Sequence, residues 1–105
     1  MAVLIFLAGQ SKTAGVSVDV DPAGLAMQIE TWLGPNQTTK VASSGKISFT
    51  STGSAQVVPC PVVMPTSGNH NVYVDVYYQG VLIAAFQATD SISILSVSPP
   101  VVVWT

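Results

Sequence analysis

Two runs of residues decide the fold: Val72-Tyr73-Val74-Asp75-Val76-Tyr77-Tyr78 and Val81-Leu82-Ile83-Ala84-Ala85-Phe86-Gln87-Ala88, which only Gln79-Gly80 separates. β-Branched and aromatic residues dominate both runs and favour strands. In the first run the valines share one face, and Tyr73, Asp75 and Tyr77 share the other. Because glycine supplies the positive φ that a two-residue turn requires, the stretch predicts a tight antiparallel hairpin.

A period of two residues recurs outside this hairpin and predicts further strands. These lie at residues 16–21, 25–33, 46–50 and 91–94, and continuous apolar runs predict strands at residues 2–8, 57–58, 62–64 and 101–104 as well. Over 25–33 the pattern places Leu25, Met27, Ile29 and Leu33 inward and Gln28 and Glu30 outward. A helix is the weaker alternative there, because Gly24 and Gly34-Pro35-Asn36 bracket a segment of strand length.

Local breaks in the pattern predict irregular structure. Pro59-Cys60-Pro61 is expected to break the ladder and leave an edge strand with a kink, because proline lacks the donor that a central strand needs. Residues 66–71 have the composition of a loop. The alternation changes phase after Ile94, which predicts a β-bulge near Ile94 and Leu95.

Length and composition limit the fold and function classes. The chain has 105 residues, which is one domain. Only 8% of residues are charged and 49% are hydrophobic, which excludes a disordered chain. There is no arginine and the formal net charge is −2, so we expect no nucleic-acid partner. No stretch approaches the roughly 20 apolar residues that span a bilayer, so we expect no membrane insertion.

About eight short strands punctuated by glycine and proline predict an all-β fold, namely a single antiparallel β-sandwich of about 7–9 strands over residues 1–105. From Gly45 to Ile94 the arrangement resembles immunoglobulin-like modules of the bacterial adhesion and phage structural type. The segments that carry this resemblance are Gly68–Tyr77, Gln79-Gly80, Leu82–Phe86 and Thr89–Ile92. The resemblance implies an immunoglobulin-like topology. It does not extend to the antibody-type pattern of two cysteines, because Cys60 is the only cysteine.

The residue types that usually carry catalysis are scarce. His70 is the only histidine, and it stands in the expected loop, where a solvated turn residue is more common than a member of a Ser67/His70/Asp75 triad. We expect Cys60 to be a buried structural residue, because nothing nearby in sequence would activate its thiol. Asp19 and Asp21 share a strand face, but they supply too few oxygens for calcium. We therefore expect no enzyme, no cofactor and no metal site.

The surface of the predicted sandwich suggests contacts with other molecules. Tyr73, Tyr77, Tyr78 and Trp32 form an outward aromatic face suited to protein contact, with carbohydrate stacking as an alternative. Residues 2–8 and 101–104 are apolar on both strand faces, which is typical of strands buried on both sides. The expected interface residues are Val3, Ile5, Leu7, Tyr73, Tyr77, Val101, Val103 and Trp104.

The chain has too few charged residues to protect the faces and edges of eight strands from association. This shortage predicts that copies of the chain cover one another. The expected function is a non-enzymatic structural subunit of a homo-oligomeric particle. Its partners would be further copies of itself and another structural protein. The closest analogy is a phage or virus component assembled in the cytoplasm: a capsid, decoration or tail protein of the virion. The alternatives are an extracellular filament or surface-layer subunit, and an adhesion or carbohydrate-binding module at the cell surface.

Overall fold

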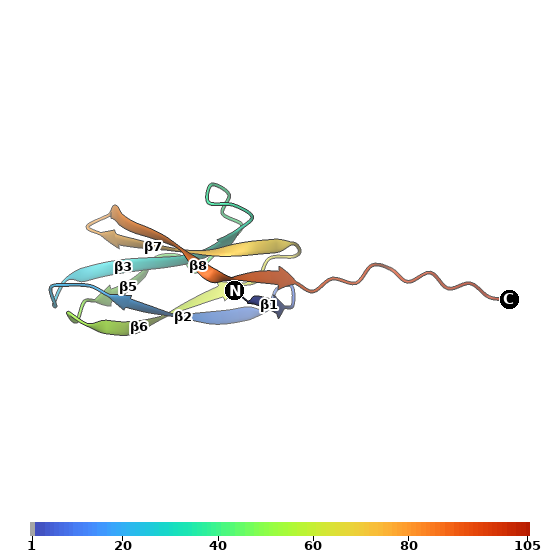
Figure 1. Cartoon of the computed structure of the whole chain (residues 1–105), viewed down its shortest axis with the longest axis horizontal. Helices are drawn as coiled ribbons and strands as arrows, with labels where there is room; N and C mark the ends of the chain where they lie inside the picture. The colour runs from blue at the N-terminus through green and yellow to red at the C-terminus, as the bar shows by residue number, and fades with distance from the viewer. Residues whose placement is uncertain (1) are drawn as a thin grey trace.

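The predicted hairpin is present as strands β7 (Asn69–Tyr78) and β8 (Val81–Ile94), which run antiparallel. Its turn holds Gln79 at φ 51° and Gly80 at φ 78°, and two successive positive values are what a type I′ turn requires. The structure is a computed structural model that describes residues 2–105 (Figure 1). Both strands extend beyond the predicted stretch, and β8 continues through Thr89 and Asp90 without interruption.

The hairpin belongs to a six-stranded sheet with the order β1-β8-β7-β3-β4, in which β5 also pairs with β3. The other four strands are β1 (Val3–Phe6), β3 (Ala26–Gly34), β4 (Ala42–Ser43) and β5 (Ile47–Thr50). The expectation of a wholly antiparallel sandwich is wrong for one pair, because β1 runs parallel to β8. These two strands are far apart in sequence, so no short turn dictates their relative direction.

The second sheet contains only β2 (Ser11–Asp19) and β6 (Ala55–Val63). The expected break at Pro59-Cys60-Pro61 is wrong, because β6 pairs with β2 over its whole length, with Pro59 opposite Gly15 and Pro61 opposite Thr13. The expectation of an edge strand is correct. Prolines two residues apart direct their nitrogens to the same side, and an unbroken ladder is possible when that side faces away from the partner strand.

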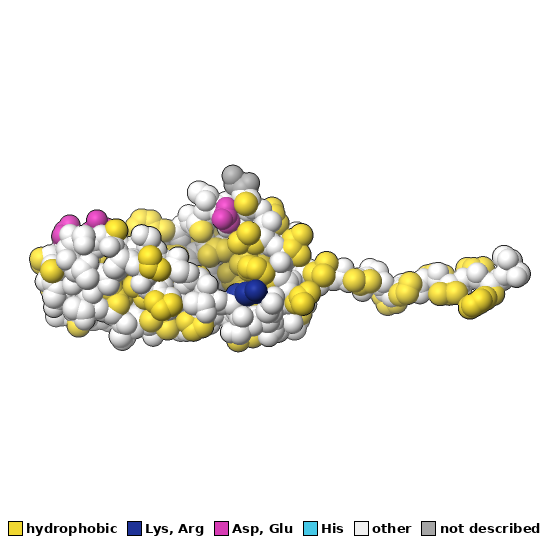
Figure 2. Space-filling model, turned by 90° about the horizontal axis from the view of Figure 1, so that it is seen from below, with side chains coloured by type: hydrophobic (Ala, Val, Ile, Leu, Met, Phe, Trp, Pro, Cys, Tyr) yellow, Lys and Arg dark blue, Asp and Glu magenta, His cyan; other side chains and the backbone are white. Residues whose placement is uncertain are grey.

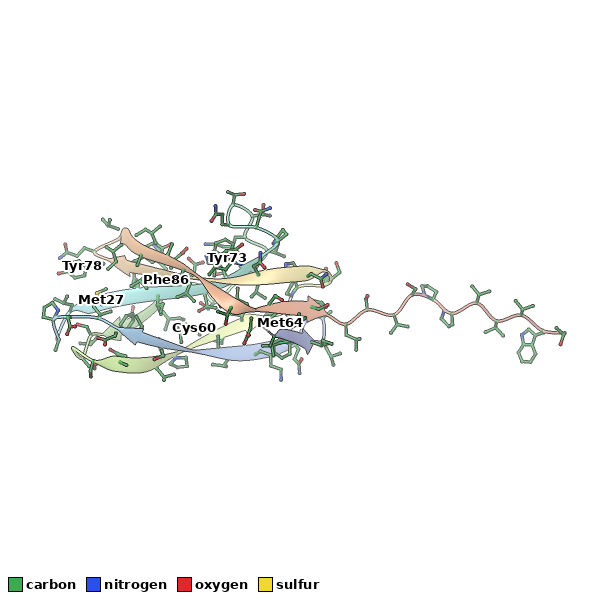
Figure 3. All side chains as sticks on the ribbon, viewed as in Figure 1. Met27, Cys60, Met64, Tyr73, Tyr78 and Phe86 are labelled. Carbon is green, nitrogen blue, oxygen red and sulfur yellow. The ribbon has the colours of Figure 1, made fainter. Side chains whose placement is uncertain are left out.

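Buried side chains from the two sheets meet between them and form the core. One cluster contains Met27, Ile29, Val58, Cys60 and Val76, and a second contains Leu33, Val62, Met64, Ile92 and Ile94. Figure 3 shows Met27 on the larger sheet and Cys60 on the smaller one. The all-β, sandwich-like fold is thereby confirmed, as are the inward positions of Met27, Ile29 and Leu33. The immunoglobulin-like topology stays a prediction.

Several local expectations are wrong. Residues 66–71 are not all loop, because β7 already begins at Asn69. No bulge occurs at Ile94 and Leu95, because β8 ends at Ile94. The irregularities instead lie within the hairpin, between Asn71 and Tyr73 and between Val76 and Tyr77. Neighbouring strands, rather than local alternation, decide where a bulge fits.

The chain beyond β8 leaves the sandwich and extends away from it (Figure 1). Residues 95–105, here called the tail, contain no strand in the single chain, so residues 101–104 do not form the expected strand within one subunit. The molecule consequently measures 72 × 23 × 23 Å. A strand needs a neighbour for its backbone hydrogen bonds, and the tail has none along residues 101–104.

Candidate functional site

A long apolar groove separates the two sheets along one side of the sandwich, where β2 faces β8. Three adjoining cavities make up the groove, with volumes of about 580, 170 and 450 Å³. Adjacent cavities share lining residues, among them Ser17 of β2 and Val74 of β7. Figure 2 shows the groove as a hollow with hydrophobic atoms inside it and charged side chains at its rims. It is open to solvent because β2 and β8 do not pair with each other.

The walls and floor of the widest part of the groove are almost entirely apolar. Leu4 and Phe6 of β1 line one end, and Leu33, Val72 and Val74 line the floor. The charged residues that line it are Lys12 and Asp90. The Lys12 ammonium lies 5.4 Å from the centre of the Phe6 ring, and the Asp90 carboxylate accepts a hydrogen bond from the Ala2 amide at 3.2 Å. The widest part of the groove therefore suits an uncharged apolar occupant, whereas the cavity of about 450 Å³ is also lined by Asp19 and Asp21.

One polar atom in this lining has no partner. Thr31 lies on β3, is 1% exposed, and lines the widest part of the groove. Its hydroxyl Oγ1 makes no hydrogen bond to any part of the chain that the structure describes. A buried hydroxyl without a partner destabilises a protein, so a partner from outside the subunit would be favourable here.

Two free strand edges flank the groove. β8 pairs with β7 on one side, but on the other side β1 covers only Ser91 to Ile94. Residues 81–90 of β8 therefore keep one edge free of any described strand. β2 is likewise free on the side opposite β6. Such edges present unpaired amide and carbonyl groups that can bind a further strand.

The tail is the most exposed apolar segment of the chain. Val101 and Trp104 are each 88% exposed, Val97 is 83% exposed, and Val103 is 79% exposed. Val3, Ile5 and Leu7 near the start of the chain are also more than half exposed. The two terminal segments thus place the expected interface residues Val3, Ile5, Leu7, Val101, Val103 and Trp104 on the surface.

The expected exposure of Tyr73 is wrong, because its ring is covered on the outer face of the sheet. Tyr73 is 6% exposed and stacks on Trp32 with the ring centroids 4.4 Å apart, and Trp32 is itself buried. The Trp32 indole N–H also donates to Asp75 at 3.0 Å. Tyr77 remains partly exposed, with the Lys46 ammonium 4.2 Å from its ring centre. The rings of Tyr73 and Trp32 stack on each other and are both buried, and together with Asp75 and Phe86 they line an open hollow of about 400 Å³.

Glu30, expected to point outward into solvent, is buried beneath Lys40. Its carboxylate accepts hydrogen bonds from the Lys40 ammonium at 2.8 Å and from the Ser43 hydroxyl. Burial alone would raise the pKa of Glu30, but these two hydrogen bonds and the Lys40 charge outweigh it and leave the pKa below its ordinary value of 4.5. The hydrogen bond to Glu30 in turn raises the pKa of Lys40 above 10.5.

The Lys40→Met variant is expected to lose about 1 kcal/mol of stability near neutral pH, because a mostly buried carboxylate loses its cation. Folding lowers the pKa of Glu30, so its ionised carboxylate stabilises the fold above pH 4.5. This stabilisation is lost as the pH falls through the pKa of the folded state. The raised pKa of Lys40 means that its contribution is present below pH 10.5 and is lost at higher pH. Chemical denaturation of wild type and variant at neutral and strongly acidic pH measures this difference.

The matched control is Lys12→Met, because Lys12 forms no ion pair among the described residues. We expect its effect to be small and similar at both pH values. A destabilisation by Lys40→Met that persists unchanged in acid would contradict the role assigned to the ion pair.

His70 and Cys60 occupy structural positions, whereas Asp19 and Asp21 lie on the surface. His70 is not a solvated turn residue: it is 7% exposed on β7, and its Nε2 lies 2.8 Å from the Ser67 carbonyl oxygen, to which it donates. His70 is buried because β7 begins earlier than expected and pairs it with Ile92. Cys60 is fully buried in the core, as predicted. Asp19 and Asp21 are both exposed, and residues 2–105 contain no group of three or more side chains placed to hold a metal ion.

Sequence analysis alone did not indicate the groove or the unpartnered Thr31 hydroxyl. The alternation over 25–33 does place Thr31 on the same face as Ile29 and Leu33, which is the signal that could have shown it to be buried. Within residues 2–105, no helix is long and apolar enough to cross a membrane. No protein-family model matches the chain, and no curated protein is significantly similar to it.

Proposed function

We propose that the protein is a non-enzymatic structural subunit of a homo-oligomeric assembly. The single observation that carries this proposal is the tail, in which apolar side chains of residues 95–105 extend into solvent from an otherwise folded sandwich. Soluble monomers rarely expose large contiguous apolar surfaces, and surfaces of this kind are typical of sites that bind other proteins.

The free edges of the sandwich support the same proposal. Proteins that remain monomeric usually protect such edges with lysine, proline or inward charges. Residues 81–90 of β8 contain no lysine and no proline, and Asp90 is their only charged residue. Val81, Leu82, Ile83 and Phe86 on this strand are each at least half exposed. An assembly would cover both the side chains and the backbone groups of this edge.

The positions of the reactive side chains support a non-enzymatic role. The thiol of Cys60 is enclosed in the core, and the imidazole of His70 is buried and bonded to the Ser67 carbonyl. General acid–base or nucleophilic catalysis requires such groups to reach a substrate.

Sedimentation velocity and light scattering of the purified chain test the proposal. We expect species much heavier than one subunit, whose share increases with protein concentration. Because apolar contacts would hold them together, added salt should leave them intact or strengthen them. A single monomeric species at all concentrations would contradict the proposal. Dissociation of the heavy species in added salt would contradict the proposal that apolar contacts hold them together.

Within this class we propose a virion component assembled in the cytoplasm, such as a capsid, decoration or tail protein. The neighbouring genes test this narrower proposal. Genes for DNA packaging or for a portal beside this one would support a virion, whereas genes for export and surface attachment would instead support an extracellular filament or surface layer.

A further inference from the structure

We propose that residues 101–104 of one copy bind in the groove between β2 and β8 of a second copy, as a strand beside the free edge of β8. This inference rests on the proposed function and specifies the contact that would build the assembly. The observation behind it is that one chain carries both an exposed apolar segment without a backbone partner and an open apolar groove flanked by unpaired edges.

The side-chain pattern of the tail matches the groove. Leu95, Val97, Val101 and Val103 share one face of an extended tail, and no residue from 95 to 105 is charged. This face would meet the apolar floor around Leu33, Val72 and Val74. The opposite face carries Val102 and Trp104, which would lie beside the exposed Val3 and Ile5 of β1. One interface would thereby cover both terminal segments, residues 2–8 and 101–104, that were expected to contact other subunits.

The backbone requirements also match. A four-residue strand at residues 101–104 measures about 13 Å, and the free edge of β8 over residues 81–90 measures about 33 Å, at roughly 3.3 Å per residue. Main-chain hydrogen bonds to an open edge give affinity without charged contacts.

The tail is directed toward another copy rather than back into its own groove. The Leu95 amide donates to the Phe6 carbonyl at 2.9 Å, which holds the start of the tail beside the end of β1, as a continuation of β8. Ser98 and Pro99 both precede a proline and are restricted to extended conformations, so Ser98-Pro99-Pro100 acts as a stiff spacer. A return to the same groove would require a reversal within this spacer and a path around β1.

A tail that binds a different surface on the next copy makes a heterologous, head-to-tail contact. Such contacts build rings when the rotation closes and filaments when it does not. The contact therefore predicts chains of subunits in which every copy both donates a tail and accepts one.

Two sets of full-length variants test the two halves of the contact. In the tail, Val101→Asp with Val103→Asp places two charges on the face that would enter the groove. Its matched control, Ser96→Asp with Ser98→Asp, adds the same charges to the part of the tail that precedes residues 101–104. We expect the first pair to weaken association by about 100-fold or more, because an unpaired carboxylate is costly in an apolar site, and the control to assemble.

In the groove, Ala88→Lys places a charge on an exposed residue of β8 that lines two of the three cavities. Its matched control is Ala85→Lys on the same strand, which is also exposed but lines none of those cavities. We expect Ala88→Lys to prevent assembly and Ala85→Lys to permit it. Circular dichroism checks that each variant is folded.

Mixing the two defective proteins gives the decisive measurement. The Ala88→Lys protein keeps its tail, and the Val101→Asp/Val103→Asp protein keeps its groove, so the mixture should form one-to-one dimers that grow no further. The emission of Trp104 should shift to the blue on dimer formation, because Trp32 is already buried in the free subunit.

The outcomes separate this inference from the proposed function. Wild-type protein that is always monomeric would overturn both. Wild-type protein that assembles, while the tail variant or the groove variant assembles equally well, would overturn the inference alone. Loss of assembly in both members of a matched pair, or absence of dimers in the mixture, would also overturn it.

Discussion

Ile29→Ala is expected to lower the free energy of unfolding by about 3–4 kcal/mol, a large part of the 5–15 kcal/mol typical of a small domain. Ile29 is fully buried on β3 and packs in a cluster with Val58 and Cys60 of β6 and Val76 of β7. Its truncation removes a contact that joins the two sheets. The truncation also enlarges the cavity of about 170 Å³ that Ile29 lines.

Guanidinium denaturation followed by circular dichroism measures this loss, with all proteins diluted until they are monomeric, because association would add to apparent stability. Ile83→Ala is the matched control, since Ile83 is 54% exposed on β8 and the same atoms are removed. We expect the control to lose less than about 1 kcal/mol. Equal losses at the two positions would show that the cluster around Ile29 is not the core of the sandwich.

The parts of the fold that were predictable from the sequence are those set by local rules. Gln79-Gly80 allows little except a tight turn, and the alternation around Met27 and Ile29 fixes which face of β3 points into the core between the sheets. The strand at Ile47–Thr50 likewise follows from its alternation between glycines. In each case the information lies within a few residues of the structure that it specifies.

Errors arose where a residue's environment comes from a distant part of the chain. Glu30 alternates as an outward residue, but Lys40 and Ser43 fold over it and compensate its burial. Tyr73 likewise alternates outward, yet Trp32 of the neighbouring strand stacks on it. Neither pairing can be read from alternation, because alternation assigns a side chain to a face and does not show what covers that face.

The groove could not be predicted for a related reason. It exists because the strands divide unequally between the sheets, with β2 alone opposite β8 and β1 covering only the last residues of the β8 edge. Sequence patterns mark strands but do not assign them to sheets. The tail poses the converse problem. Residues 101–104 have the apolar pattern of a strand buried on both sides, and that pattern is the same whether the burial occurs within one subunit or between two.

Gly34→Ala is expected to destabilise the subunit by about 3 kcal/mol, because there is no space for a Cβ atom at this position. An added Cβ would lie 1.8 Å from the backbone carbonyl oxygen of Thr39 and 3.1 Å from the ring of Trp32. The backbone after β3 must therefore move outward. Since Lys40 follows Thr39, this movement would also separate the Lys40 ammonium from the buried Glu30 carboxylate.

Two measurements separate this explanation from a general intolerance of alanine in strands. Gly15→Ala on β2 is the control, because its Cβ would meet only the movable Val57 side chain, at 3.3 Å, and we expect a loss below about 1 kcal/mol. In the double variant Gly34→Ala/Lys40→Met, the second change should cost less than it does in wild type, because the displaced loop has already broken the ion pair. Additive losses would mean that the loop stays in place. The cost of Gly34→Ala would then lie in the packing around Trp32, and Lys40 would still cover Glu30.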